Sequence, residues 1–157
     1  KNDCKVEIEW IDSKEFEKDS SSIERLRMFN GIVVPGGFGG TGVEGKICAI
    51  KYVRENNIPY LGLCFGLQLA VVEFARNKCN LRDAHTTEIN QLTQYPVIDI
   101  LDEQKNINDK GGTMRLGAYK AVLKDGTLVR SLYGSNEISE RHRHIYEVNP
   151  SYHKILD

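Results

Sequence analysis

Residues 58–66 have the sequence IPYLGLCFG. Ile58–Leu63 is typical of a strand, and Phe65–Asn77 continues as a strongly apolar helical pattern. Cys64 lies at the junction in a G-x-C-x-G pattern, the cysteine analogue of the hydrolase nucleophile elbow. Gly62 and Gly66 remove Cβ atoms that would collide in so sharp a turn. We therefore predict a strand, a tight turn and a helix, with the Cys64 thiol projecting above the sheet.

The start of the predicted helix also suits a nucleophile at Cys64. Unpaired backbone N–H groups and the positive end of the helix dipole favour thiolate over thiol. The N–H of Phe65 points towards the oxygen of any acyl carbon under attack, which makes half of an oxyanion hole. The alternative is a buried structural thiol, because free cysteine is among the most buried residue types.

The other cysteines, Cys4, Cys48 and Cys79, are widely spaced and form no C-x-x-C pair. We expect packing or surface roles for them. Disulfide frameworks are typical of short secreted domains, so reduced thiols in the cytosol fit this chain better.

A glycine-rich loop, PGGFGG at residues 35–40, follows the short apolar run Gly31–Val34, which is typical of a strand covered on both faces. In open parallel sheets, ligands bind at the carboxyl ends of strands, and glycines let backbone amides approach a ligand closely. The spacing matches neither phosphate-binding glycine motif. We predict an oxyanion or amide-binding loop with Gly37 as the second N–H donor. A flexible connector is the alternative.

Gln68 lies about one helical turn after Cys64 and so faces the same side of the helix. A buried amide on such an apolar helix needs partners, which favours a role in the site. A surface glutamine is the alternative.

Strand-like and helix-like segments alternate in the first half of the chain, which is the signature of parallel βαβ units. We predict an α/β fold with an open, mostly parallel sheet flanked by helices, additional β-strands in the second half, and no helix there. The predicted strands are Val6–Ile11, Gly31–Val34, Ile58–Leu63, Tyr95–Asp99 and Ala118–Leu123. The predicted helices are Phe65–Asn77 and Val43–Asn56, with Val43, Ile47, Ile50 and Val53 on one face. Turns are predicted at residues 124–126 and 103–112.

The composition suits one ordinary domain, with 157 residues of which 40% are hydrophobic. With 21 basic and 22 acidic residues the net charge is -1, so no global field attracts nucleic acid or an anionic membrane. No apolar run reaches membrane-spanning length, and Lys1 opens a charged segment rather than a signal peptide. We expect a cytoplasmic protein that binds small neutral or zwitterionic ligands. The missing initiator methionine and the abrupt end at Asp157 suggest a piece of a longer chain.

The glycine loop and Gly62–Gln68 together resemble the two glutaminase motifs of the class I glutamine amidotransferases. Further segments resemble the CTP synthase branch of that family, and the likeness covers essentially all of residues 1–157. These segments are Gly42–Lys46, Asn57–Gly62, Thr86–Glu88, Gly111–Gly117 and Glu140–His144. The resemblance implies one partial glutaminase domain with a flavodoxin-like fold.

The resemblance implies that Cys64 attacks the side-chain amide of L-glutamine, releasing ammonia and leaving a γ-glutamyl thioester that water hydrolyses. Gly37 and Phe65 would stabilise the oxyanion. The substrate-binding residues it implies are Gly37, Phe65, Gly66, Leu67, Gln68 and Glu88, the last at the amino group of glutamine. Ammonia would pass to an N-terminal synthase domain that aminates UTP to CTP, in pyrimidine biosynthesis, with ATP and magnesium. The resemblance places no cofactor in the glutaminase domain and implies a homo-oligomer, a tetramer, with GTP as an activator.

The sequence departs from the family pattern in several places. It lacks the C-terminal H-P-E motif that carries the family's catalytic histidine and glutamate, and the first strand and helix are also absent. We therefore expect this chain alone to be inactive. Ile145 stands where the family has an arginine that contacts glutamine, and Thr41 where it has an arginine associated with GTP. The histidines present, none in the matching context, are His85, His142, His144 and His153.

Other functions stay open at this point. Another class I amidotransferase or a related cysteine hydrolase would share the elbow, although Glu88 and Gly111–Gly117 argue against it. A catalytically dead regulatory or binding domain is the second alternative. Arg141–His144 is either a solvated basic strand, which we favour, or a metal or polyphosphate patch. Because a missing central strand exposes a sheet edge, we also expect marginal stability with aggregation.

Overall fold

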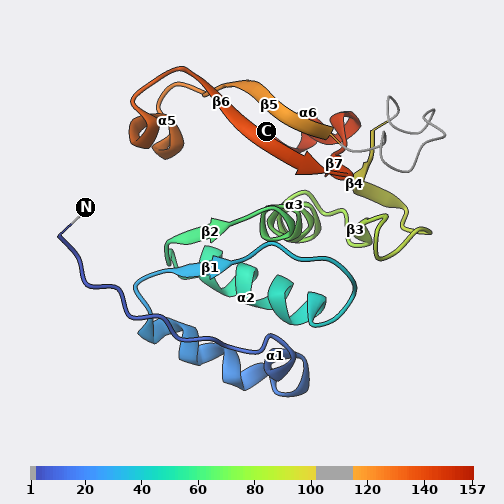
Figure 1. Ribbon diagram of the computed structural model, residues 1–157. Coiled ribbons are helices and arrows are strands. Elements are labelled where there is room, and N and C mark those ends of the chain that lie inside the picture. Colours follow the sequence, from blue (N-terminus) through green and yellow to red (C-terminus); the bar gives the residue numbers. More distant parts are fainter. Residues whose placement is uncertain (1–2, 102–114) are drawn as a thin grey trace. The chain divides into compact units, whose positions relative to one another are not determined.

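The structure is a computed structural model that describes residues 3–101 and 115–157. The chain divides into two compact units, the first comprising Lys1–Asp99 with Val148–Asp157 and the second Ile100–Glu147 (Figure 1). Each is described by itself. The turn region predicted at residues 103–112 lies outside the described residues. Within those described ranges, no helix has the length and apolar character needed to cross a membrane.

The first unit is built on two parallel strands, each followed by a helix (Figure 1). β1 (Ile32–Val34) pairs in parallel with β2 (Tyr60–Gly62). α2 (Val43–Glu55) follows β1, and α3 (Phe65–Asn77) follows β2. The predicted βαβ arrangement is confirmed, and α3 has the predicted bounds.

The two helices pack against each other through an apolar face and a buried ion pair. The four residues predicted to share a face of α2 are all buried. Glu73 of α3 is 1% exposed, and its carboxylate accepts hydrogen bonds from Arg54 Nε at 3.0 Å and Arg54 Nη2 at 2.8 Å. Asn77 Nδ2 adds a third donor at 3.1 Å. The buried charge is therefore fully hydrogen-bonded, as its burial requires.

The strand predicted at Val6–Ile11 is wrong, because this segment has no regular structure. Val6, Ile8 and Trp10 are 75%, 74% and 84% exposed. A strand needs a neighbour to complete its backbone hydrogen bonds, and none of the described strands pairs with this segment.

Two short helices that the sequence analysis did not predict follow this segment. They are α1 (Lys14–Lys18) and the 3-10 helix η1 (Ser20–Met28). Phe16 and Leu26 from these helices are buried in one cluster with Ala49 and Val53 of α2. This cluster is the core on the outer side of α2.

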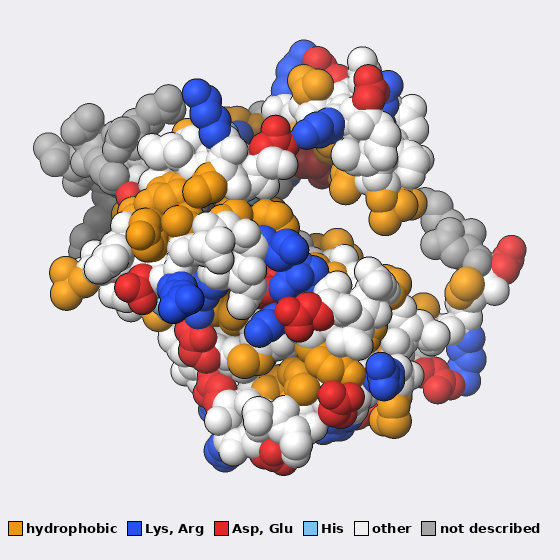
Figure 2. Space-filling model, turned by 180° about the vertical axis from the view of Figure 1, so that it is seen from behind, with side chains coloured by type: hydrophobic (Ala, Val, Ile, Leu, Met, Phe, Trp, Pro, Cys, Tyr) orange, Lys and Arg blue, Asp and Glu red, His pale blue; other side chains and the backbone are white. Residues whose placement is uncertain are grey.

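Within the described residues of the first unit, the sheet of β1 and β2 is not covered on both faces, contrary to the prediction from the apolar run Gly31–Val34. Val34 is buried, but Val33 and Leu61 are 56% and 53% exposed. Successive side chains of a strand point to opposite faces, so one face packs on the helices and the other is open. Figure 2 shows exposed hydrophobic side chains (orange) among charged ones on the surface seen from behind.

The rest of the first unit is a second parallel pair and the C-terminal turn. β3 (Ala84–Thr86), which was not predicted, pairs with β4 (Tyr95–Ile100), which was. All three residues of β3 are buried. η2 (Pro150–Tyr152) and α6 (His153–Leu156) end the chain.

The second unit is an antiparallel hairpin with a short helix in its connection. β5 (Arg115–Val122) pairs with β6 (Glu137–His144) along its whole length. α5 (Leu128–Tyr133) lies between them, and β7 (Tyr146–Val148) leads back to the first unit.

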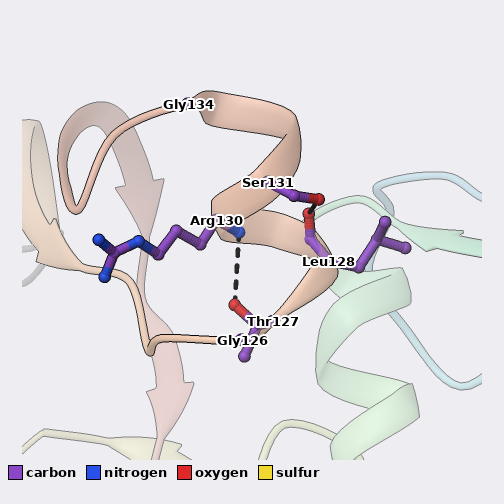
Figure 3. A pocket seen from close by; sticks show the side chains of 6 residues that line it. All are labelled: Gly126, Thr127, Leu128, Arg130, Ser131 and Gly134. Atoms are coloured by element: carbon purple, nitrogen blue, oxygen red, sulfur yellow. Dashed lines mark hydrogen bonds between the residues drawn. The ribbon is translucent and has the colours of Figure 1, made fainter.

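α5 contradicts the prediction that the second half has no helix, because a six-residue helix is too short to show a periodic pattern. The helix nevertheless has residues of the usual capping types at both ends. Thr127 Oγ1 accepts the N–H of Arg130 at 3.3 Å, and Gly134 ends the helix with φ 68°. Gly126, with φ 76°, forms the turn predicted at residues 124–126. Figure 3 shows the open hollow around these caps, lined by Gly126, Thr127, Leu128, Arg130, Ser131 and Gly134.

Candidate active site

The predicted elbow is present at Cys64. Its backbone angles are φ 53° and ψ −108°, which is a strained conformation for any residue other than glycine. α3 begins at the next residue. A Cβ on Gly66 would lie 2.1 Å from the Val34 carbonyl oxygen, and one on Gly62 would lie 2.7 Å from the Leu67 nitrogen. Both glycines are therefore required by the close approach of β1, β2 and α3. Cys64 is exposed, so the alternative of a buried structural thiol is wrong.

The glycine loop after β1 lies directly beside the elbow. A Cβ on Gly36 would be 3.3 Å from Cys64 Cβ and 3.9 Å from Cys64 Sγ, and one on Gly37 would be 3.9 Å from the Phe65 ring. The N–H of Phe65 is among the first four of α3, which have no acceptor inside the helix. The two predicted oxyanion donors thus come from two elements that meet at the thiol.

The neighbouring positions of α3 are held in place by main-chain hydrogen bonds. Gly66 N–H donates to Leu63 O at 2.9 Å, and Gly66 O accepts the Tyr60 hydroxyl at 2.8 Å. Gln68 is 8% exposed, so the surface alternative for it is wrong, and its N–H donates to Cys64 O at 3.1 Å. Leu67 is 54% exposed. Of the predicted substrate-binding run, Leu67 therefore has an exposed side chain, and Gln68 is buried.

Glu88 lies in the turn after β3 and reaches the glycine loop. Its Oε1 accepts the N–H of Gly39 at 3.0 Å, and its own N–H donates to Thr86 Oγ1 at 3.2 Å. The structure thus joins Glu88 to the loop that borders Cys64, although 24 positions separate Glu88 and Cys64 in the sequence.

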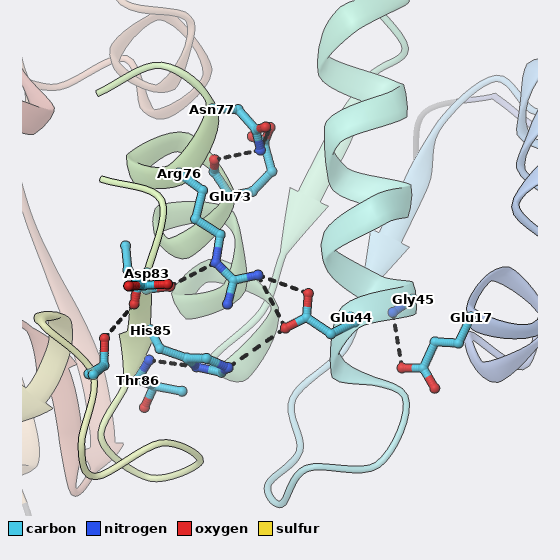
Figure 4. A network of polar contacts seen from close by, with 11 residues as sticks. Glu17, Glu44, Gly45, Glu73, Arg76, Asn77, Asp83, His85 and Thr86 are labelled. Atoms are coloured by element: carbon cyan, nitrogen blue, oxygen red, sulfur yellow. Dashed lines mark hydrogen bonds and ion pairs between the residues drawn. The ribbon is translucent and has the colours of Figure 1, made fainter. Parts of the chain in front are cut away.

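A polar cluster that the sequence analysis missed ties α2, α3 and β3 together (Figure 4). Arg76 Nη1 lies 2.8 and 3.1 Å from the two carboxylate oxygens of Glu44, and Arg76 Nε donates to Ala84 O at 2.8 Å. His85 Nε2 lies 3.7 Å from Glu44 Oε1, and His85 Nδ1 accepts the N–H of Thr86 at 2.9 Å. The only sequence signal was an acidic residue in the first turn of α2, which is common at helix starts. The cluster fixes the end of the glycine loop through α2.

The pKa of His85 is lowered by burial and by the charge of Arg76, against the opposing effect of Glu44. The unfolded chain therefore takes up a proton at this residue near a pKa of about 6.5, and the folded chain does so only at lower pH. Because the unfolded state then binds more protons, this residue should make stability fall as pH drops below about 7. Urea unfolding at pH 7.5 and 5.5 should show a smaller acid loss for His85→Asn, whose Oδ1 still accepts the Thr86 N–H. An equal loss in both proteins would contradict this.

In the described part of the first unit, neither His85 nor His153 forms a hydrogen bond with Cys64. In the second unit, the His142 ring makes edge contacts with Tyr119, at 5.3 Å between centroids, and with His144, at 5.6 Å. His144 Nδ1 lies 3.6 Å from Glu147 Oε1. His153 is exposed at the start of α6. Residues 3–101 and 115–157 contain no group of three or more His, Cys, Asp or Glu arranged to hold a metal ion. The geometry therefore gives no support to a metal patch at Arg141–His144.

The two positions that depart from the family pattern are both accessible. Thr41 lies near the end of the glycine loop, where its carbonyl accepts Lys46 Nζ at 3.0 Å. Ile145, between β6 and β7, is 36% exposed.

Comparisons with known proteins agree with this arrangement. The family profile described as Glutamine amidotransferase class-I matches residues 1–156. The chain is 59% identical over 151 residues to the CTP synthase of Methanosarcina acetivorans and 59% identical over 162 residues to that of Methanocaldococcus jannaschii. These alignments cover 96% and 100% of this chain, but the chain spans only 28% and 30% of those relatives.

A solved structure, the Trypanosoma brucei CTPS glutaminase domain with bound acivicin, is similar with a TM-score of 0.87 and 38% identity. The match covers 98% of this chain and 59% of that one. With the predicted elbow and open α/β architecture present, the chain belongs to the class I glutamine amidotransferase family.

Proposed function

We propose that this chain is the glutaminase part of a CTP synthase and that Cys64 is its nucleophile. One observation carries the proposal: an exposed cysteine at φ 53° starts a helix beside a glycine loop, with a Gly36 Cβ position 3.9 Å from its sulfur. The CTP synthase relatives favour this function over another amidotransferase or a general cysteine hydrolase.

In the proposed reaction, Cys64 Sγ attacks the side-chain amide carbon of glutamine. The thiol proton passes to the nitrogen, the C–N bond breaks and ammonia leaves, so that a γ-glutamyl thioester remains on Cys64. Water then hydrolyses the thioester to glutamate and restores the thiol. The N–H groups of Gly37 and Phe65 would stabilise the oxyanion in both steps, because they are fixed before charge develops.

Glutamine would lie along Phe65–Gln68, with its ammonium group at the Glu88 carboxylate. The base that the family carries in its H-P-E motif is not in this sequence, so we propose that full turnover depends on a base that these 157 residues do not provide. Ammonia would serve a synthase part that aminates UTP with ATP and magnesium, in a homo-oligomer. Because of Thr41 and Ile145, we expect two features to differ from the family: activation by GTP, and the side-chain contact with glutamine at position 145.

Replacing Gly37 tests the oxyanion hole. Gly37→Pro removes the N–H donor, and release of ammonia from glutamine should fall by about 10²–10³-fold when the variant is tested within a longer chain that supplies the base. Gly37→Ala is the matched control, since it keeps the N–H, its φ is not positive, and its Cβ meets only the Phe65 ring at 3.9 Å. Equal rates in the two variants would rule out Gly37 as a donor. Failure of a glutamine-like chloroketone to label Cys64 in the unaltered protein would favour the catalytically dead domain.

A further inference from the structure

We propose that Glu88 positions the glycine loop, residues 35–42, in addition to contacting the substrate. The inference rests on the proposed glutaminase function and deepens it. Its basis is the hydrogen bond from Gly39 N–H to Glu88 Oε1 at 3.0 Å, which links the loop beside the nucleophile to the turn after β3.

The loop segment that borders the elbow is held only by its ends. Within the described part of the chain, residues 35–38 make no hydrogen bond, and these include Gly36 and Gly37 beside Cys64 and Phe65. Gly39 is the first anchor after β1. Further anchors follow it: Thr41 O accepts Lys46 Nζ at 3.0 Å, and Gly42 O accepts Ser13 Oγ at 2.9 Å and the Lys46 N–H at 3.0 Å. The position of the Gly37 N–H therefore depends on β1 at one end and on Glu88 at the other.

The turn that carries Glu88 is rigid enough to act as an anchor. Thr86, at the end of β3, is fully buried, and its Oγ1 and O accept the N–H groups of Glu88 at 3.2 Å and Ile89 at 3.1 Å. A Cβ on Gly40 would contact Ile89 at 3.8 Å, so the loop packs on this turn as well as bonding to it.

The Glu88 carboxylate has enough acceptor capacity for both tasks. An ionised carboxylate offers about four lone-pair sites on its two oxygens. In the described structure Oε1 holds Gly39, and Oε2 has no partner. The loop contact needs only an acceptor, whereas an ammonium contact is strengthened by the negative charge. Glu88→Gln should therefore keep the loop contact and weaken the ammonium contact, and Glu88→Ala should remove both.

Hydrogen exchange at the Gly39 amide tests the loop contact without any catalysis. Loss of one hydrogen bond should speed exchange of this amide about tenfold in Glu88→Ala. Glu88→Gln should restore most of the protection. The Leu63 amide, bonded to Val34 O at 3.0 Å, is the internal control for folding and should not change. An unchanged Gly39 exchange rate in Glu88→Ala would overturn the proposal.

A pair of electrophiles tests the consequence for the nucleophile. One is 2-amino-5-chloro-4-oxopentanoate, a chloroketone shaped like glutamine, and the other is 5-chloro-4-oxopentanoate, which lacks the amino group. With the second probe, Cys64 of Glu88→Ala should be labelled about tenfold more slowly than Cys64 of Glu88→Gln, because only the loop contact differs. Equal labelling of both variants by this probe would limit Glu88 to the ammonium contact. If the unaltered protein reacts with neither probe, the glutaminase function fails, while the Gly39 exchange result still decides the loop contact.

Discussion

Gly66→Ala is expected to lower the free energy of unfolding by about 3 kcal/mol or more, since overpacking of this kind forces backbone shifts. The new Cβ would lie 2.1 Å from the Val34 carbonyl oxygen and 2.9 Å from its carbon, and neither belongs to a flexible side chain. Alanine gains about 1 kcal/mol over glycine inside a helix, but the clash outweighs that gain. Relief would require β1 and α3 to separate, and that would open the elbow.

Urea unfolding monitored by circular dichroism measures this loss. Gly37→Ala is a suitable control because its Cβ makes only an ordinary contact with the Phe65 ring at 3.9 Å. A Gly66→Ala protein within about 1 kcal/mol of the unaltered one would show that α3 does not need its close approach to β1.

Within a longer chain that supplies the base, Cys64→Ala and Cys64→Ser should lower the rate of ammonia release from glutamine by more than about a thousand-fold, as removal of a nucleophile does in other hydrolases. In the proposed reaction the carbon of the amide is attacked by this sulfur, and neither replacement supplies a thiol. Stability should change little, since the side chain is exposed and alanine meets the same backbone strain at φ 53°.

Cys48→Ala is the matched control for this loss. Cys48 is also an exposed thiol, but partial burial and the charge of Glu44 raise its pKa, which lowers its thiolate fraction. Its replacement should leave ammonia release unchanged. A Cys64→Ser protein that still releases ammonia at the original rate would move the chemistry to another residue.

Local pattern was sufficient to predict the elements that carry the elbow. The apolar run before Cys64 and the helical spacing of apolar residues in Phe65–Asn77 both reflect packing within one βα unit. The bounds of α3 could therefore be predicted from the sequence. The same approach failed at Val6–Ile11, where an alternating pattern exists but no described strand pairs with it. It also failed for α5, which is fixed by its caps rather than by a periodic face.

The site was predictable to the extent that it is local. Cys64 and Phe65 belong to one turn, and Gly37 follows from the rule that ligands bind at the carboxyl ends of parallel strands. The cluster of Glu44, Arg76 and His85 joins three elements far apart in the sequence, and only the fold brings them together. The contact between Glu88 and Gly39 is of the same kind.

The open face of the sheet bears on the expectation of marginal stability, which stays a prediction. Val33, Leu61 and Leu63 expose 56%, 53% and 47% of their surface, and such exposed apolar side chains favour association. The ion pair of Arg54 with the buried Glu73 favours the folded state, but only while both partners remain.

The most direct test is to find which thiol a glutamine-like chloroketone modifies in the unaltered protein. Peptide mapping by mass spectrometry can distinguish the four cysteines, all of which are free. The account predicts one label, on Cys64, formed more slowly when glutamine is present as a competitor. Labelling spread over Cys4, Cys48 and Cys64 with no protection by glutamine would contradict it.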